Sequence, residues 1–313
     1  MAEIKKIATR EAYGNALAEL GETNKNIVVL DADLSKSTKT DAFKKKFPER
    51  HINMGIAEAN MMSTAAGLAS CGKTVFASSF AVFAAGRAFE QVRNSICYPK
   101  LNVKIGATHA GISVGEDGGS HQAVEDIAIM RALPNMVVLS PCDAEESKQA
   151  VLAAAEYDGP VYLRFGRLAV APVYEEGKCP FELGKGITLR EGKDVTIVTT
   201  GLMVQESIAA ADILKSKGID AGIIDIHTIK PLDREIIKAA AEKTGKIVTV
   251  EEHNIYGGLG SAVAEVIAEE APAKLLRIGL NDVFGKSGTP AALLEEYGLN
   301  AEKIAEKIEK FVK

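Results

Sequence analysis

Two histidines and two acidic residues lie close together in one glycine-rich segment, residues 108–122. His109, Glu116, Asp117 and His121 follow an apolar run that predicts a strand. Ligands of open α/β sheets bind at the carboxyl ends of strands, where the closely spaced glycines would let the backbone approach a ligand. The histidines lack the spacing of metal ligands on a helix, so we expect them to form hydrogen bonds and transfer protons. A polar surface loop without a function is the alternative.

Glu58 opens a predicted helix, residues 58–71, that is small and apolar on nearly every side. A helix without a charged face is a buried helix, so Glu58 is expected to enter a poorly solvated environment. Burial of a carboxyl group is costly unless the site requires one. Glu58 could equally be a first-turn acid that complements the helix dipole.

Three further groups of side chains follow predicted strands. Phe80 and Phe83 have a spacing that favours core packing over a ring-binding pocket. Arg164 and Arg167 end another strand, where a guanidinium group suits a phosphate or, equally, a surface salt bridge. The segment 31–37, with two aspartates and two serines, ends the first strand in the same way.

The elements that must position these side chains alternate between apolar, β-branched runs and amphipathic stretches of helical length. Most runs are continuously apolar, as expected when helices cover both faces of a parallel sheet. This order predicts an α/β protein with two domains and mostly parallel sheets. The predicted strands span residues 27–30, 74–77, 103–107, 137–140, 161–165, 195–199, 219–226, 247–250 and 275–278. The predicted helices span residues 10–20, 58–71, 144–157, 206–217, 235–242 and 301–311.

The length and one irregular segment predict the domain organisation. At roughly 100 to 200 residues per domain, the 313 residues predict about two domains. Residues 166–182 break the alternation with Pro172, Gly177 and Pro180, and a new strand begins at Val195. We therefore expect domains at residues 1–182 and 183–313.

The composition excludes several classes of protein. Hydrophobic residues at 47% and charged residues at 25% are typical of a globular protein. A net charge of −5 without a long basic run disfavours nucleic-acid binding. No apolar run approaches the roughly 20 residues that a membrane span requires, and the charged start is unlike a signal peptide. The four cysteines lie far apart without a C-x-x-C pair, which is typical of reduced thiols in the cytoplasm.

Taken together, these segments resemble the transketolase family of thiamine-diphosphate enzymes. The resemblance includes Ala32-Asp33-Leu34, Gly55-Ile56-Ala57-Glu58 and Gly115-Glu116-Asp117-Gly118 followed by His121-Gln122. In the second predicted domain it continues through residues 228–233 and 251–260. The motifs occur in order over essentially the whole chain, so together they are far more specific than any one alone. The resemblance implies a pyrimidine-binding domain followed by a transketolase C-terminal domain.

The resemblance also implies roles for individual residues. Glu58 matches the glutamate that hydrogen-bonds N1′ of the cofactor's aminopyrimidine and thereby promotes proton removal from the thiazolium ring. Phe80 and Phe83 match aromatic positions that stack on the aminopyrimidine, and Asp33 matches a second acidic contact near the cofactor. The residues matching substrate contacts are Arg10, Ser37, His109, Asp117, His121 and Arg167, with His109 and His121 also assisting proton transfer.

A partner subunit is implied as well. In the family, another α/β domain holds the diphosphate and its divalent metal, Mg²⁺ or else Ca²⁺ or Mn²⁺, through a Gly-Asp-Gly…Asn motif that this sequence lacks. We therefore expect the C-terminal subunit of a split transketolase, which binds no metal itself. With an N-terminal partner subunit it would form a heterotetramer and transfer a two-carbon ketol unit from a ketose phosphate to an aldose phosphate in the pentose phosphate pathway.

Three alternatives stay open. The β subunit of a 2-oxoacid dehydrogenase E1 component has a similar length and domain order, although the segment 115–122 favours a sugar substrate. A 1-deoxyxylulose-phosphate synthase fragment would share Gly-Ile-Ala-Glu. A non-catalytic regulatory subunit of the same fold is the third alternative, against which the intact Glu58, His109, Asp117 and His121 argue.

Overall fold

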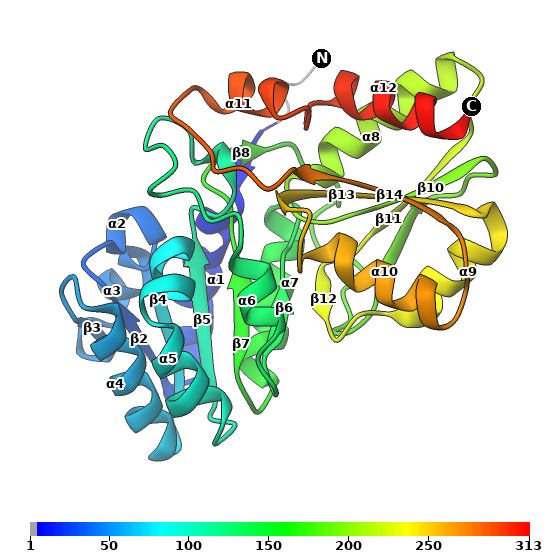
Figure 1. Ribbon diagram of the computed structural model, residues 1–313. Coiled ribbons are helices and arrows are strands. Elements are labelled where there is room, and N and C mark those ends of the chain that lie inside the picture. The colour runs from blue at the N-terminus through cyan, green and yellow to red at the C-terminus, as the bar shows by residue number, and fades with distance from the viewer. Residues whose placement is uncertain (1–4) are drawn as a thin grey trace.

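Two mainly parallel sheets contain most of the strands, and helices cover both faces of each sheet (Figure 1). The computed structural model describes residues 5–313. The first sheet has the strand order β12-β6-β7-β5-β4-β2-β3, and only β12 runs antiparallel to its neighbour. The second has the order β14-β13-β10-β11-β9, with β9 antiparallel. The predicted α/β class with mostly parallel sheets is confirmed.

The first unit of the chain builds the first sheet, apart from β12, together with its helices and a small antiparallel sheet of β1 and β8. Its strands are β1 (Ile7–Ala8), β2 (Ile27–Asp31), β3 (His51–Asn53), β4 (Thr74–Phe80), β5 (Val103–Thr108), β6 (Val137–Leu139), β7 (Val161–Arg164) and β8 (Ala169–Val170). Its α-helices are α1 (Thr9–Thr23), α2 (Ser35–Thr38), α3 (Asp41–Lys46), α4 (Glu58–Ser70), α5 (Phe89–Gln91), α6 (Asp126–Arg131) and α7 (Ala144–Glu156). Short 3₁₀ turns lie at Pro48–Arg50 and Ile112–Val114, and π-helical turns at Phe83–Arg87 and Val92–Cys97.

The second unit builds the second sheet. Its strands are β9 (Ile187–Arg190), β10 (Val195–Thr199), β11 (Ala221–Asp225), β12 (Thr228–Lys230), β13 (Lys246–Asn254) and β14 (Lys274–Leu280). Its helices are α8 (Met203–Ser216), α9 (Arg234–Thr244), α10 (Leu259–Glu269), α11 (Pro290–Glu296) and α12 (Ala301–Val312). All predicted strands and helices occur, most with shifted ends, and β10 has the predicted ends. Strands β9 and β12 and helices α10 and α11 were not predicted. Among residues 5–313, no helix is both long enough and apolar enough to cross a bilayer.

The core explains why the strands are continuously apolar. Strands β2, β4, β5, β7 and β10 are buried at every position, because helices pack on both faces. Helices α1 and α7 cover one face of the first sheet, and α8 and α12 cover one face of the second. A third apolar cluster runs from α4 and the opposite face of the first sheet to α9 and α10. The two units therefore share part of their core.

Strand β12 joins the units in a way the sequence did not predict. It follows β11 in the second unit but pairs with β6 at the edge of the first sheet, with Thr228 opposite Leu139. A main-chain hydrogen bond from Ser140 to His227 extends this contact. The pairing brings the end of β11 close to the turn that leads into α7.

Candidate active site

The side chains singled out above gather at one edge of the first sheet. Strands β2, β4, β5 and β7 are parallel, so their carboxyl ends lie at the same edge. Segment 31–37, Phe80, His109 and Arg167 all lie at or just beyond these ends. This is the edge where open α/β sheets bind ligands.

Glu58 lies at the start of α4 and is 1% exposed. Helix α4 turns Met61, Met62 and Ala65 into the core, whereas Asn60, Ser63 and Gly67 on its other face are exposed. The predicted burial of Glu58 is therefore confirmed, but the prediction of a helix buried on nearly every side is wrong. The carboxylate accepts a hydrogen bond from Arg87 Nη1 at 2.8 Å and one from Ser79 Oγ at 3.3 Å. Glu58 therefore presents a desolvated carboxyl group at the ligand-binding edge rather than at the surface.

Arg87 is a site residue that the sequence reasoning missed. It ends the π-helical turn Phe83–Arg87, half-exposed, and its guanidinium lies 4.5 Å from the centre of the Phe83 ring. The same group forms the ion pair with Glu58. The spacing of four residues between Phe83 and Arg87 could have predicted their contact, because a cation four residues after an aromatic ring lies beside it on a helix.

Phe80 and Phe83 stack on each other and on the histidines. Their ring centres lie 6.0 Å apart with an angle of 16° between the planes. His109 stacks on Phe80 at 3.8 Å, and His121 presents its edge to Phe83 at 5.4 Å. Spacing alone favoured core packing, and Phe80 is buried, whereas Phe83 is half-buried. With the two imidazoles, the rings form one aromatic cluster.

His109 is held in a neutral form. Burial, together with the charges of Arg10 and Arg167 and with His121, lowers the pKa of His109 to about 3. Arg10 Nη1 lies 3.4 Å from Nε2, and because an arginine only donates, Nε2 is assigned as the acceptor. The proton then resides on Nδ1, 2.9 Å from Thr108 Oγ1. His109 Nε2 can accept a proton from a ligand only after the Arg10 guanidinium has moved away from it.

Two arginines line the same region. Arg10 Nη1 donates to the main-chain oxygen of Ser37 at 2.6 Å, so it is the carbonyl of Ser37 that contacts the arginine. Arg167 donates to the main-chain oxygen of Val114 and lies 3.8 Å from the Asp117 carboxylate. Both positive charges also act on His109. The arrangement can bind an anion such as a phosphate.

Asp33 is tied to the turn that precedes Glu58. Its carboxylate accepts from Asn53 Nδ2 at 2.8 Å, and Asn53 Oδ1 accepts from the main-chain nitrogens of Asp33 and Gly55, each at 3.0 Å. Asp33 has a left-handed backbone, with φ of 64°. The three residues hold segments 31–37 and 55–58 together at the mouth of the site.

The glycines of segment 108–122 contact the second unit. A Cβ at Gly111 would lie 2.3 Å from the Glu252 carboxyl carbon, and the backbone there has φ of +79°. Glu252 in turn accepts from Ser113 N at 2.5 Å. Added Cβ atoms at Gly118 and Gly119 would meet residues 285–287. We expected the glycines to let a ligand approach, but here they let the second unit approach and hold the segment.

Arg164 has a structural role. Its guanidinium is buried and forms two hydrogen bonds with the Asp126 carboxylate, at 2.9 and 3.2 Å. It also donates to the main-chain oxygen of Glu252 at 3.0 Å. Of the two roles considered for this residue, a phosphate contact or a surface salt bridge, neither is correct, since the ion pair is buried.

The geometry defines what this edge can do chemically. A buried carboxyl group can hold a hydrogen bond to a ring nitrogen, and the aromatic cluster, in which Phe83 is half-buried, can pack against a ring. Two imidazoles can bind hydroxyl groups and move protons. The arginines can bind an anion at the outer end. The site therefore suits a ligand with a heteroaromatic ring and a substrate with hydroxyl and phosphate groups.

Comparisons with known proteins agree with both units. Residues 5–172 match the transketolase pyrimidine-binding domain, and residues 184–304 match the transketolase C-terminal domain. A transketolase C-terminal section of Methanocaldococcus jannaschii is 57% identical over 96% of this chain and 94% of its own length. One subunit of an apulose-4-phosphate transketolase of Phocaeicola vulgatus is 39% identical over 98% of each chain.

A solved structure gives the same result. It is described as a split gene transketolase in an inactive β4 tetramer, and it superimposes with a TM-score of 0.89 at 56% identity over 98% of each chain. Both domain types, in the same order and over nearly the full length, are thus shared with these proteins. The chain belongs to the transketolase family.

Proposed function

We propose that this chain is the C-terminal subunit of a two-chain transketolase, with the pyrimidine-binding domain at residues 1–182 and the C-terminal domain at 183–313. The observation that carries the proposal is the buried Glu58 carboxyl group, which Arg87 joins to the stacked rings of Phe80 and Phe83. The names of similar proteins support it, since one is a C-terminal section and another is one subunit of a transketolase. The proposed location is the cytoplasm, in keeping with four free cysteines.

The residues present fit thiamine diphosphate. An aminopyrimidine is a flat ring with a basic nitrogen, and this edge offers an aromatic surface with a desolvated carboxyl group next to it. When bound, the cofactor supplies the nucleophilic carbon that ketol transfer requires. The metal and the diphosphate are assigned to the partner, because the sequence has no Gly-Asp-Gly motif.

Each residue of this chain then has a defined task. Glu58 holds a hydrogen bond at N1′ of the pyrimidine, and Arg87 has to leave the carboxylate or share it when that bond forms. Phe80 and Phe83 orient the ring and exclude water. Asp33 steadies the turn before Glu58 through Asn53.

The substrate contacts lie farther out. His109 and His121 bind sugar hydroxyls and move protons, His109 through Nε2 once Arg10 turns to the substrate. Asp117 accepts from a further hydroxyl group. Arg10 and Arg167, with Ser37 beside Arg10, hold the sugar phosphate.

Reconstitution tests the proposal directly. The chain is purified alone and together with an N-terminal transketolase subunit, and ketol transfer between sugar phosphates is measured with thiamine diphosphate and Mg²⁺. Activity is expected only from the pair, in a complex with two copies of each chain by light scattering. Full activity of this chain alone would refute the two-chain assignment. Decarboxylation of a 2-oxoacid in place of ketol transfer would assign the chain to the E1 β class, and inactivity of the assembled pair towards every substrate would indicate a regulatory subunit.

A further inference from the structure

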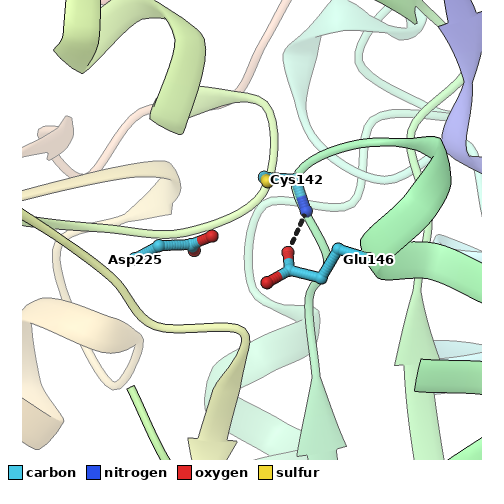
Figure 2. Close-up of side chains that lie close together, drawn as sticks. All are labelled: Cys142, Glu146 and Asp225. Atoms are coloured by element: carbon cyan, nitrogen blue, oxygen red, sulfur yellow. Dashed lines mark hydrogen bonds between the residues drawn. The ribbon is translucent and has the colours of Figure 1, made fainter. Parts of the chain in front are cut away.

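Three metal-ligating side chains meet away from the active site, at the junction of the two units (Figure 2). Cys142 precedes α7, Glu146 lies in the first turn of α7, and Asp225 ends β11. Their sulfur and carboxylate oxygen atoms lie within 4.8 Å of one another, and all three side chains are fully buried. Figure 2 shows the two carboxylates extending towards each other, with the sulfur next to them.

Each carboxylate has one oxygen in use and one free. Glu146 Oε2 accepts from the main-chain nitrogen of Cys142 at 2.7 Å, and Asp225 Oδ2 accepts from the Tyr174 hydroxyl at 2.8 Å. The other oxygens, Glu146 Oε1 and Asp225 Oδ1, are buried without a hydrogen-bond partner in the described chain. Buried acceptors left unpaired are costly. Glu146 and Asp225 lie close enough to hydrogen-bond each other, so either a proton shared by the two carboxyl groups or a bound cation can satisfy these oxygens.

No basic side chain balances the cluster. Neither Glu146 nor Asp225 forms an ion pair within residues 5–313, and the charged groups acting on them are acidic, including the nearby Asp143. Both oxygens of the Asp143 carboxylate already accept hydrogen bonds, from the main-chain nitrogens of Glu146, Val173 and Tyr174. Burial, and for Glu146 the neighbouring Asp225 charge, raise the pKa of both carboxyl groups. When both are ionised, each buried charge costs several kcal/mol. A cation between the three ligands would remove that cost.

The donor set indicates which cation fits. One thiolate and two carboxylate oxygens suit Zn²⁺, whereas Mg²⁺ and Ca²⁺ prefer oxygen ligands throughout. Zinc bonds of about 2.3 Å to sulfur and 2.0 Å to oxygen place tetrahedral ligands about 3.5 Å apart, so the atoms need to close in by about 1 Å. Gln205 is a candidate for the fourth ligand: its nitrogen donates to Cys142 O at 2.9 Å, and its Oε1 is buried without a partner.

We propose that Cys142, Glu146 and Asp225 bind one Zn²⁺ ion that ties the second unit to the start of α7. The ion has a structural role and lies outside the site proposed for ketol transfer. The ligands come from both units, so bound zinc stabilises their junction by mass action.

Metal content and spectroscopy test this site on the chain itself. The purified protein is dialysed against Zn²⁺ and then against buffer, and its zinc is measured by elemental analysis. We expect one Zn²⁺ per chain, a thiolate-to-cobalt charge-transfer band after Co²⁺ replacement, and a lower melting temperature when a chelator removes the metal.

Two variants and one control locate the site. Cys142→Ser should abolish the cobalt band, and Asp225→Asn should weaken zinc binding about tenfold or more. Cys97→Ser, which changes a buried cysteine outside the cluster, should leave both unchanged. If a variant does not fold, the zinc content and cobalt band of the unaltered chain still decide the matter. Absence of zinc and of the cobalt band from the unaltered chain would overturn the proposal. The Glu146 and Asp225 carboxyl groups would then share a proton instead of a metal ion. A band that persists in Cys142→Ser would also refute the site.

Discussion

Asp126→Asn should be among the most destabilising conservative changes in the chain. The Asp126 carboxylate is 1% exposed and accepts two hydrogen bonds from Arg164 and one from Tyr162 OH at 2.8 Å. The amide keeps the size of the side chain but removes its charge, so the buried guanidinium of Arg164 loses its hydrogen-bonded counter-ion and keeps only the neighbouring Glu252 carboxyl group. No cavity forms, and the effect is electrostatic.

The expected loss follows from the burial of the pair. Breaking a buried ion pair by neutralising one partner costs about 3–5 kcal/mol of unfolding free energy. The remaining hydrogen bonds of Arg164 to main-chain oxygens of Ala123 and Glu252 place the loss towards the lower end of this range. Arg164 joins α6 to β13, so the change should also loosen the contact between the units.

Urea unfolding followed by circular dichroism measures the effect as a shift of the midpoint. The matched control is Glu191→Gln, which neutralises one partner of an exposed ion pair with Lys243 and should leave the midpoint nearly unchanged. The double variant Asp126→Asn/Arg164→Met should regain much of the stability, because it removes the unpaired charge as well. A midpoint for Asp126→Asn equal to that of the control would refute the argument from burial.

Three further predictions concern the candidate active site. In the reconstituted enzyme, Glu58→Gln should lower kcat about 10²–10⁴-fold while circular dichroism and subunit assembly stay unchanged; near-normal kcat would remove Glu58 from the chemistry. Arg167→Ala should raise KM for phosphorylated sugars about tenfold or more with a smaller change in kcat, and an equal rise for unphosphorylated sugars would contradict a phosphate contact. The pKa of His109 is about 3 in the folded chain against an ordinary 6.5, so below pH 6.5 the unfolded state binds the proton first and stability falls by up to about 1.4 kcal/mol per pH unit. Urea midpoints between pH 6 and 4 should therefore fall more steeply in the unaltered protein than in His109→Asn, and equal slopes would show that His109 is protonated in the folded state.

Local pattern was sufficient for the longer strands and most of the longer helices and for the edge that carries the site, but not for short elements such as β3, β9 and α6. The run Val103–Ala107 predicted β5, which extends to Thr108, because continuous apolar sequence identifies a strand covered on both faces. The burial of Glu58 was predictable for a similar reason, since α4 has no charged face. Parallel strands then bring the segments that follow them to one edge. These conclusions need only periodicity and the geometry of parallel sheets.

Contacts between segments that are distant along the chain could not be predicted from local sequence patterns. Arg164 and Arg167 are three residues apart in one segment, yet one is buried against Asp126 and the other lies half-exposed beside Asp117. Which of them meets a carboxylate in the interior depends on where α6 packs. Arg87 similarly reaches Glu58 only because a π-helical turn follows β4.

The amino-acid sequence by itself determined the α/β class, the order of the main strands and helices, and the family resemblance, because periodicity and motif order are local properties of the chain. Only the tertiary structure decided that the glycines at 111–119 admit Glu252 and residues 285–290, and that β12 completes the first sheet. It alone brought Asp225 to Cys142 and Glu146, since 79 residues of chain separate Asp225 from the nearer of the two. Such contacts depend on how whole sheets and helices pack. The sequence around a side chain does not indicate a partner that lies so far away along the chain.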